Sequence, residues 1–224
     1  IGYEYGTAVN DFFYSHTYMF YYSEPFTHTG VLATYSCSDE TEIYLGWVDG
    51  WDTAFEFTGG SQLKGGIQQS IGDAVTLFYA FLVGQRERGN LRVGSGFNHS
   101  VILEADLTEK LQAVFQHDWA DYSDIDQSEY GINQRFIYTI NDRWACAVRG
   151  EWWRTSADGG SGSDIYALTL GLNVRPQANI VFRPEIRWDW NSDGAAGIGQ
   201  AGLGEPVNDL NGDVTFGMDA VLRY

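Results

Sequence analysis

The sequence predicts an all-β protein: an antiparallel transmembrane β-barrel of about 12 strands, with short periplasmic turns and long extracellular loops. Three observations lead to this prediction. Apolar and polar residues alternate along most of the chain, which gives each extended segment one apolar and one polar face. Tight turns alternate with long polar connections. Aromatic residues make up 16% of the chain, as is typical of the belts that barrels place at membrane interfaces.

The segment 180–190 shows the alternation most clearly. Phe182, Ile186 and Trp188 share one face of an extended strand, and charged residues occupy the other face. The charged face needs water or paired partners, because an unpaired buried charge is costly. A soluble sandwich would turn the same charges outward, so this strand alone leaves both solutions open. Recurrence of the pattern along the chain favours lipid outside and a wet lumen inside.

The strands follow one another between turn signals. Residues 164–175 alternate Leu168, Leu170 and Leu172 with small and polar residues, and in 142–154 Trp144 and Trp152 bracket an apolar face. Proline inside a strand removes a ladder hydrogen bond, so Pro184 predicts a local kink or bulge. The predicted strands are 1–6, 29–37, 41–50, 62–70, 74–84, 97–107, 110–119, 129–140, 142–154, 164–175, 179–190 and 212–224.

Two kinds of connection separate these strands, and they alternate along the chain. Asp, Asn, Gly and Pro favour tight turns through side-chain hydrogen bonds or a suitable backbone. Short turns on one side and long loops on the other are typical of an outer-membrane barrel. Tight turns are predicted at 38–40, 71–73, 107–109, 140–142 and 175–179, and long loops at 51–61, 85–97, 120–129, 156–163 and 191–211.

Composition limits the function classes. The 224 residues contain no linker, which predicts a single domain over 1–224. No apolar run approaches the roughly 18 to 20 residues of a membrane-spanning helix. The net charge of -17 would repel phosphates, so we expect no nucleic-acid partner. The chain starts at Ile1 without a leader, and export to the outer membrane is therefore inferred and not seen.

The predicted inner face is strongly charged. Basic groups facing acidic groups across a lumen would create a transverse field that orients solutes and biases ion passage. Alternatively, Arg and Glu on adjacent strands simply pair and fill a narrow lumen. The expected pore-lining residues are Arg135, Arg143, Arg149, Glu151, Arg175, Arg183, Glu185, Arg187, Asp189, Asp219 and Arg223.

The connection 10–28 is unusually aromatic. Left in water it would form a large exposed apolar patch. We expect it to fold into the lumen as an inward loop or short helix and to narrow the pore; the alternative is a surface loop that packs on its neighbours. The expected constriction residues are Phe12, Phe13, Tyr14, Tyr18, Phe20, Tyr21 and Tyr22.

Signals for catalysis or metal binding are weak. The four histidines form no HExxH motif, and neither a serine elbow nor a P-loop is present, so we expect no enzymatic activity and no cofactor. Residues 209–213 place oxygen ligands at alternate positions, which suits Ca²⁺. They lack the glycine and the bidentate glutamate of a calcium loop, so a solvated acidic turn is favoured, and the acidic loop 121–129 has the same ambiguity.

The chain ends on a strand, 215–224, that carries Phe216, Met218 and a terminal Tyr224 on one face. This end looks like the signal that outer-membrane assembly machinery recognises. Together with the blocks 13–19, 24–35, 50–53, 151–153 and 183–190, the sequence resembles the OmpL-like β-barrel porins of the second type. The resemblance implies diffusion of small solutes across a bacterial outer membrane, and it implies that Ile1 lies inside the barrel sequence.

The function predicted from the sequence is that of a passive outer-membrane porin for small hydrophilic solutes or ions. Its partners would be outer-membrane lipid and those solutes, and a homo-oligomer is one possible assembly. Two alternatives stay open. One is a non-conducting barrel that anchors surface loops or a partner. The other is a soluble acidic β-protein whose exposed Trp and Tyr bind carbohydrate.

Overall fold

The computed structural model describes residues 1–6, 10–54, 60–88, 91–122, 126–156, 162–191, 198–199, 206–207 and 212–223. Eleven strands form one antiparallel sheet, in which strands adjacent in space follow one another in the chain until β10 pairs with β13. The strands of the sheet are β1 (Gly30–Ser36), β2 (Thr41–Val48), β3 (Ser61–Ile71), β4 (Val75–Arg88), β5 (Leu91–Thr108), β6 (Leu111–Tyr122), β7 (Gln127–Asn141), β8 (Trp144–Ser156), β9 (Ser163–Gln177), β10 (Ile180–Asn191) and β13 (Asp213–Leu222). β11 (Ile198–Gly199) and β12 (Pro206–Val207) pair antiparallel in a separate two-stranded sheet.

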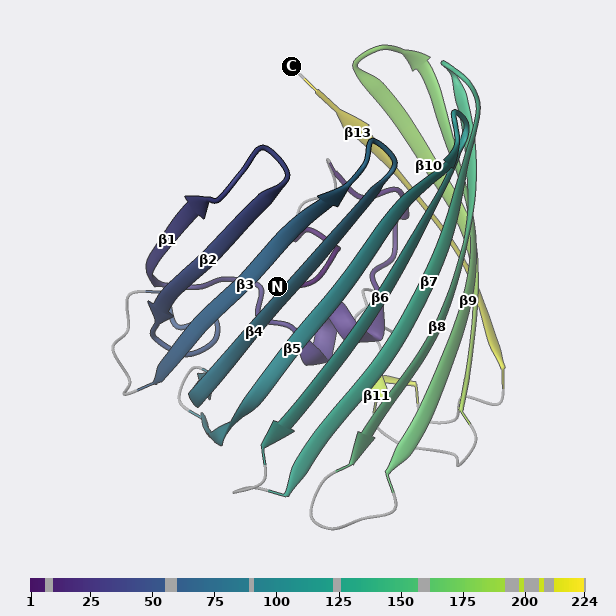
Figure 1. Cartoon of the computed structure of the whole chain (residues 1–224). Helices are drawn as coiled ribbons and strands as arrows, with labels where there is room; N and C mark the ends of the chain where they lie inside the picture. The colour runs from purple at the N-terminus through teal and green to yellow at the C-terminus, as the bar shows by residue number, and fades with distance from the viewer. Residues whose placement is uncertain are drawn as a thin grey trace.

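Every strand of the sheet overlaps a strand predicted from the sequence, so the antiparallel all-β class is confirmed. The predicted strand at 1–6 is wrong: these residues are irregular and lie within the curve of the sheet (Figure 1). The reason is the Glu4 side chain, which is buried against two arginines of the inner wall. A local alternation of residue types cannot reveal such a distant charge pair.

The tight turns are confirmed, and they gather at one end of the sheet, which we call the turn end. Two predicted long loops are wrong. Most of 85–97 belongs to β4 and β5, and the connection at 120–129 shortens to the residues between β6 and β7. Polar residues in these stretches continue the strands. Beyond the membrane a strand is held by its backbone hydrogen bonds, and its side chains can be polar because they face water.

The pairing of β9 with β10 is irregular around Pro184, as predicted. It shifts register between Ile180 and Phe182, and it skips Arg183 and Pro184 before it resumes at Glu185 opposite Gly171. On the other side of the strand, Pro184 lies opposite Met218 of β13 without a register shift in that pair.

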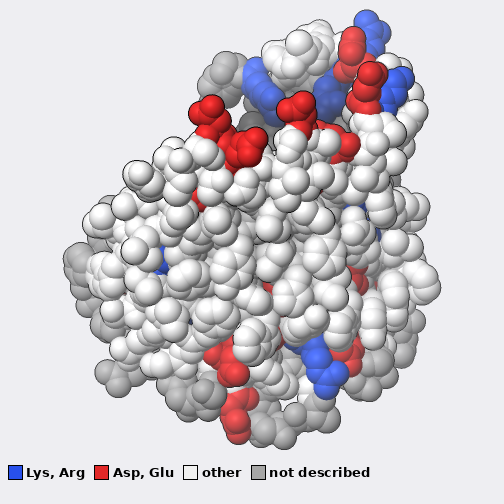
Figure 2. Space-filling model, viewed as in Figure 1, with Lys and Arg blue, Asp and Glu red and all other residues white. Residues whose placement is uncertain are grey.

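The two faces of the sheet differ as the alternation predicts. Leu170 is 52% exposed and Trp188 45% exposed on the outer face, whereas Arg187, the chain neighbour of Trp188, is 1% exposed on the inner face. Figure 2 shows that charged side chains on the visible face gather toward its two ends, around a mostly uncharged band. A soluble sandwich would reverse this arrangement, so the soluble carbohydrate-binding alternative is wrong.

The inner side of the sheet holds the N-terminal segment, residues 1–6 and 10–28, which includes the short helix η1 (Met19–Ser23) (Figure 1). One apolar cluster joins Tyr18 and Met19 of this segment to Trp153, Ile165 and Ala167 of the wall. No helix among the described residues has the length and hydrophobicity needed to cross a membrane. The core of the protein thus lies between the segment and the wall.

The sheet is strongly curved, and β1 and β13 form its two ends. Among the described residues these two strands are not paired with each other, so the closed seam that the sequence predicts is not seen in this structure. The order of the strands, each an antiparallel neighbour of the next, is that of a barrel wall.

Candidate functional site on the inner wall

The inner wall brings together most of the charged residues predicted from the sequence. Arg135 of β7, Arg149 of β8, and Arg183 and Arg187 of β10 are all buried. The acids Glu151, Glu185 and Asp189 are buried beside them, and Asp219 of β13 is half-buried. These side chains share a face because residues of equal parity on a strand point the same way.

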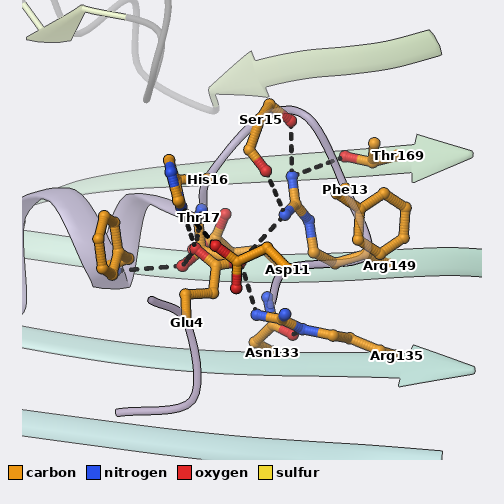
Figure 3. A network of polar contacts seen from close by, with 12 residues as sticks. Glu4, Asp11, Phe13, Ser15, His16, Thr17, Asn133, Arg135, Arg149 and Thr169 are labelled. Carbon is orange, nitrogen blue, oxygen red and sulfur yellow. Dashed lines mark hydrogen bonds and ion pairs between the residues drawn. The ribbon is translucent and has the colours of Figure 1, made fainter. Parts of the chain in front are cut away.

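Arg135 and Arg149 converge on one carboxylate of the N-terminal segment (Figure 3). Arg135 Nη2 donates to Glu4 Oε1 at 2.7 Å, and Arg149 Nη1 donates to the same oxygen at 3.0 Å. All three side chains are almost completely buried. A buried ion pair needs such additional donors, because desolvation otherwise cancels the Coulombic gain.

The second oxygen of Glu4 faces a different set of donors. The backbone N–H of Thr17 donates to Glu4 Oε2 at 2.9 Å, Thr17 Oγ1 donates at 3.2 Å, and His16 Nδ1 lies 3.2 Å away. Burial by itself would raise the pKa of the Glu4 carboxyl. The Arg135 guanidinium, the His16 hydrogen bond and the Arg149 guanidinium outweigh it and hold that pKa well below its ordinary value.

Glu185 and Arg183 of β10 bind the backbone of the segment. Glu185 accepts hydrogen bonds from the N–H groups of Tyr14, at 2.8 Å, and Ser15. Arg183 Nη1 donates to the carbonyl oxygens of Asp11 and Phe13, while its Nε and Nη2 form a fork with the Asp219 carboxylate. The wall therefore supplies both acceptors and donors to a stretch of chain that lacks strand pairing.

Arg187 completes this set of contacts. Its Nε donates to Asp189 Oδ1 at 2.8 Å, and its Nη1 donates to the carbonyl oxygen of His16 at 2.5 Å. Glu151 Oε1 accepts from the Met19 N–H at 3.0 Å, and Asp189 Oδ1 accepts from the Tyr18 hydroxyl at 3.1 Å. The charges of the wall are thus satisfied both by the N-terminal segment and by each other, as in the pairs Arg183–Asp219 and Arg187–Asp189.

The predicted constriction residues lie inside the curve of the sheet, as expected. Phe13, Tyr18 and Phe20 are buried, and Phe12, Tyr14, Tyr21 and Tyr22 are half-buried. The surface-loop alternative for this segment does not hold in this structure. Its narrowing of a pore stays a prediction.

Glycines of the wall allow the segment to approach closely. A Cβ atom at Gly217 would lie 2.6 Å from Tyr14 Cδ1, and one at Gly131 would lie 2.3 Å from Met19 Cγ. Such distances are far below van der Waals contact, so a larger residue at either position would force the facing side chain or the segment to shift. The surface of the wall that holds the N-terminal segment therefore matches it in shape as well as in charge.

A second carboxyl of the segment, Glu24, meets the wall at β6. Gln116 Nε2 donates to Glu24 Oε1 at 2.6 Å and also to both oxygens of Asp118, at 3.1 and 3.0 Å. Burial, followed by the nearby Asp118, raises the pKa of Glu24 well above its ordinary value. The two carboxyls lie in one buried group that favours a proton.

Glu4, Ser15, Thr17 and Glu24 were not among the residues predicted for the site. Ser15 accepts from Arg149 through both its carbonyl oxygen and its Oγ. The available signal was indirect: a wall with several inward arginines needs acceptors, and the aromatic connection 10–28 was already expected to fold against that wall. Nothing local marks the four residues that supply those acceptors.

The remaining predicted arginines lie at the turn end. A cavity of about 340 Å³ is lined there by residues that include Arg175, Arg183 and Arg223. Arg143 lies exposed in the turn between β7 and β8, and so is not on the inner face of a strand. Arg223 follows β13 and is exposed, with its N–H donating to the Asn179 carbonyl at 2.9 Å.

Within the described ranges, no group of three or more His, Cys, Asp or Glu side chains is placed to hold a metal ion. The possible calcium turn at 209–213 falls largely on residues outside the described part of the chain. The acidic loop 121–129 also includes residues that are not described.

Solved structures with the same fold are outer-membrane proteins. The outer membrane channel DcaP of Acinetobacter baumannii is 12% identical with a TM-score of 0.61, covering 86% of this chain and 61% of that one. An anion-selective porin from Comamonas acidovorans is 11% identical with a TM-score of 0.62, covering 86% and 57%. In-vitro folded OmpT, an outer membrane protein of Vibrio cholerae, is 16% identical with a TM-score of 0.56, covering 86% and 63%. The chain therefore spans less than two thirds of each of these proteins.

No curated protein matches the sequence. A family described as "Putative beta-barrel porin-2, OmpL-like" matches residues 1–224. This match agrees with the two faces of the sheet, since apolar side chains lie on the outer face and charged side chains on the inner face, the reverse of a soluble protein. The chain therefore belongs to the OmpL-like β-barrel porin-2 family and is an integral protein of the outer membrane.

Proposed function

We propose that the protein forms a pore through which small hydrophilic solutes or ions diffuse passively, without a cofactor and without chemistry. The observation that carries this proposal is the placement of Arg135, Arg149, Arg183 and Arg187 on the buried inner face, behind an outer face whose middle band is mostly uncharged (Figure 2). A wall of this kind is stable in a bilayer only if its inner side encloses polar groups or water.

The N-terminal segment sets how open such a pore is. It lies against β6 to β10 and β13 and binds several of their charged groups, so solutes would pass beside it or after it moves. The polar cavity at the turn end supports an entrance on that side. The lining by Arg135, Arg149, Glu151, Glu185, Arg187 and Asp189 belongs to this proposal.

Planar-bilayer recording tests the proposal. The refolded protein should produce discrete, repeatable conductance steps, whereas heat-denatured protein in the same detergent should produce none. An absence of steps from correctly folded protein, verified by heat-modifiable gel mobility, would overturn the passive-pore proposal.

A second function is favoured by one observation. The segment fills much of the curve of the sheet with buried ion pairs and hydrogen bonds, which suits a non-conducting barrel that anchors surface loops. The same recording separates the two functions, because a barrel closed in this way would insert into membranes and stay silent.

A further inference from the structure

The Glu4 carboxylate lies in a cradle formed by four side chains and one backbone N–H. Two guanidinium groups, from Arg135 and Arg149, reach one oxygen, and Thr17 and His16 surround the other (Figure 3). We define these four residues as the carboxylate cradle. Both carboxylate oxygens of Glu4 have hydrogen-bond partners. Each of these partners is an N–H or O–H donor or an imidazole nitrogen.

The cradle is held in place by contacts that do not involve Glu4. Arg149 Nη1 donates to the Ser15 carbonyl at 2.7 Å, Arg149 Nη2 donates to Ser15 Oγ and Thr169 Oγ1, and the guanidinium lies 4.6 Å from the Phe13 ring centre. Arg135 Nε donates to Asn133 Oδ1 at 2.9 Å, and its guanidinium lies 4.6 Å from the Tyr3 ring. The contacts of Arg149, and the hydrogen bond from Arg135 to Asn133, do not depend on residues 1–6 and so persist when the carboxylate leaves.

Two buried guanidinium groups without a counter-ion are expensive, because both arginines are almost fully excluded from water. Removal of Glu4 therefore leaves a site that favours an anion. Its shape selects among anions, since it offers donors to two oxygens on opposite sides of one group. A chloride ion is a single atom and reaches only one of the two sets of donors. A primary amide would place its NH₂ group against one set of donors, where it has no acceptor.

We propose that the carboxylate cradle is a binding site for carboxylate-bearing solutes. Glu4 occupies it in this structure, and a solute carboxylate occupies it when residues 1–6 withdraw Glu4 while residues 10–28, with His16 and Thr17, stay docked on the wall. The identity of the solutes rests on the proposed pore function. Binding at the cradle does not, because it requires no passage through the protein.

The test uses the whole chain with Glu4→Ala, which removes the atoms of an acetate group from the cradle. Thermal unfolding in detergent should show a lower midpoint than for the unsubstituted protein, and sodium acetate should restore most of the loss. The gain should grow with acetate as expected for a ligand that binds the folded state only. Sodium chloride at equal ionic strength and neutral acetamide should restore none of it.

Two matched variants make the test specific. Glu4→Gln fills the same space without charge, so acetate should leave its midpoint unchanged. Glu4→Ala combined with Arg149→Met should lose the response to acetate, because the cradle then keeps one guanidinium. Where Glu4→Ala does not fold in plain buffer, the refolding yield is measured instead, and acetate should raise it above chloride.

Equal rescue by chloride and acetate, or an equal acetate effect on the unsubstituted protein and Glu4→Ala, would overturn the carboxylate site. Bilayer recording keeps the two proposals apart. Selective rescue by acetate in a protein that gives no conductance steps would retain the site and refute the pore. Normal steps without any acetate effect on Glu4→Ala would retain the pore and refute the site.

Discussion

Glu185 on β10 accepts a hydrogen bond from the backbone N–H of Tyr14 at 2.8 Å, across 171 residues of sequence. The same carboxylate also accepts from the N–H of Ser15. A charge that the alternation of β10 assigns to the inner wall thus holds a particular stretch of chain. The lumen wall and its occupant act as one polar structure, and this relationship leads to the predictions that follow.

Replacing Glu185 with Ala should release this stretch locally. Two N–H groups would lose their acceptor, and each unsatisfied buried donor costs about 1 to 3 kcal/mol. Hydrogen exchange followed by mass spectrometry should show faster exchange in peptides covering 10–28, with the strands unchanged. Glu40→Ala, at an exposed turn position, is the control and should exchange like the unsubstituted protein. Unchanged protection in Glu185→Ala would show that the carboxylate does not anchor the segment.

Replacing Gly217 with Ala tests the shape of the docking surface. The added Cβ would lie 2.6 Å from Tyr14 Cδ1, so either the ring or the segment must shift. We expect faster exchange over 10–28. Gly150→Ala is a matched control, because a Cβ there meets nothing within 4 Å. Equal exchange in the two variants would contradict the close approach.

Deleting residues 12–22 should raise single-channel conductance markedly. The deletion removes residues 19–22 of the helix η1 together with the predicted constriction residues that lie inside the curve of the sheet. Recordings in planar bilayers compare the deletion with the intact chain, and the Glu40→Ala protein serves as a control for handling. Unchanged conductance would end the idea that this segment narrows the pore.

Placing a charge on the outer face should depend on depth in the membrane. Leu170 lies near the middle of β9 and is largely exposed, so Leu170→Lys should cost about 2 to 4 kcal/mol. Leu107 is also exposed but lies next to the turn after β5, where Leu107→Lys should cost about 1 kcal/mol or less. Urea titration of protein folded into lipid vesicles measures both. Equal costs would contradict a membrane-facing outer surface.

Docking of the N-terminal segment should weaken as pH rises through the range near 6. Burial and the nearby Glu4 charge raise the pKa of Asp11 from 3.8 to about 6. The docked state then holds the Asp11 proton more tightly than the detached state does, so its stabilising effect is complete below 3.8 and is lost as pH rises through 6. Glu4 acts in the opposite sense, because its lowered pKa stabilises docking above 4.5 and the effect is lost as pH falls.

Asp11→Asn isolates the first effect. The amide keeps an acceptor for the Tyr5 N–H, which donates to Asp11 at 3.1 Å, but it does not titrate. Hydrogen exchange of 10–28 should therefore slow in the variant, relative to the unsubstituted protein at the same pH, once the pH exceeds 6. An identical ratio of rates at pH 4 and pH 7 would refute the role of Asp11.

Much of the fold could be predicted because its causes are local. The alternation along β8, β9 and β10 assigned Leu170 and Trp188 to lipid and Arg149 and Arg187 to the interior, and the structure agrees. The errors arise where partners distant in the sequence override the local pattern. Residues 1–6 alternate like a strand but have no partner strand, and the connection at 85–97 is polar yet paired.

The candidate site was only half predictable. The inward arginines could be found because each lies on a strand with a clear period. Their partners could not, since Glu4 lies 131 residues from Arg135 and 145 from Arg149, and the alternation of residues 1–6 predicted a strand there. Two alternatives were open for the charged wall: a transverse field, or pairing between strands. Neither included the contacts seen here, in which the N-terminal segment supplies hydrogen-bond partners to the charged groups of the wall.

The sequence by itself determined which side of the sheet meets lipid and which side encloses polar groups, because side chains alternate with a period of two and the two solvents sort them. Only the tertiary structure decided what the enclosed charges bind. Such pairing depends on where the aromatic segment folds, and this is set by burial of Tyr18 and Met19 against Trp153 and by the space left at Gly131 and Gly217. Those contacts join parts of the chain that no local pattern connects.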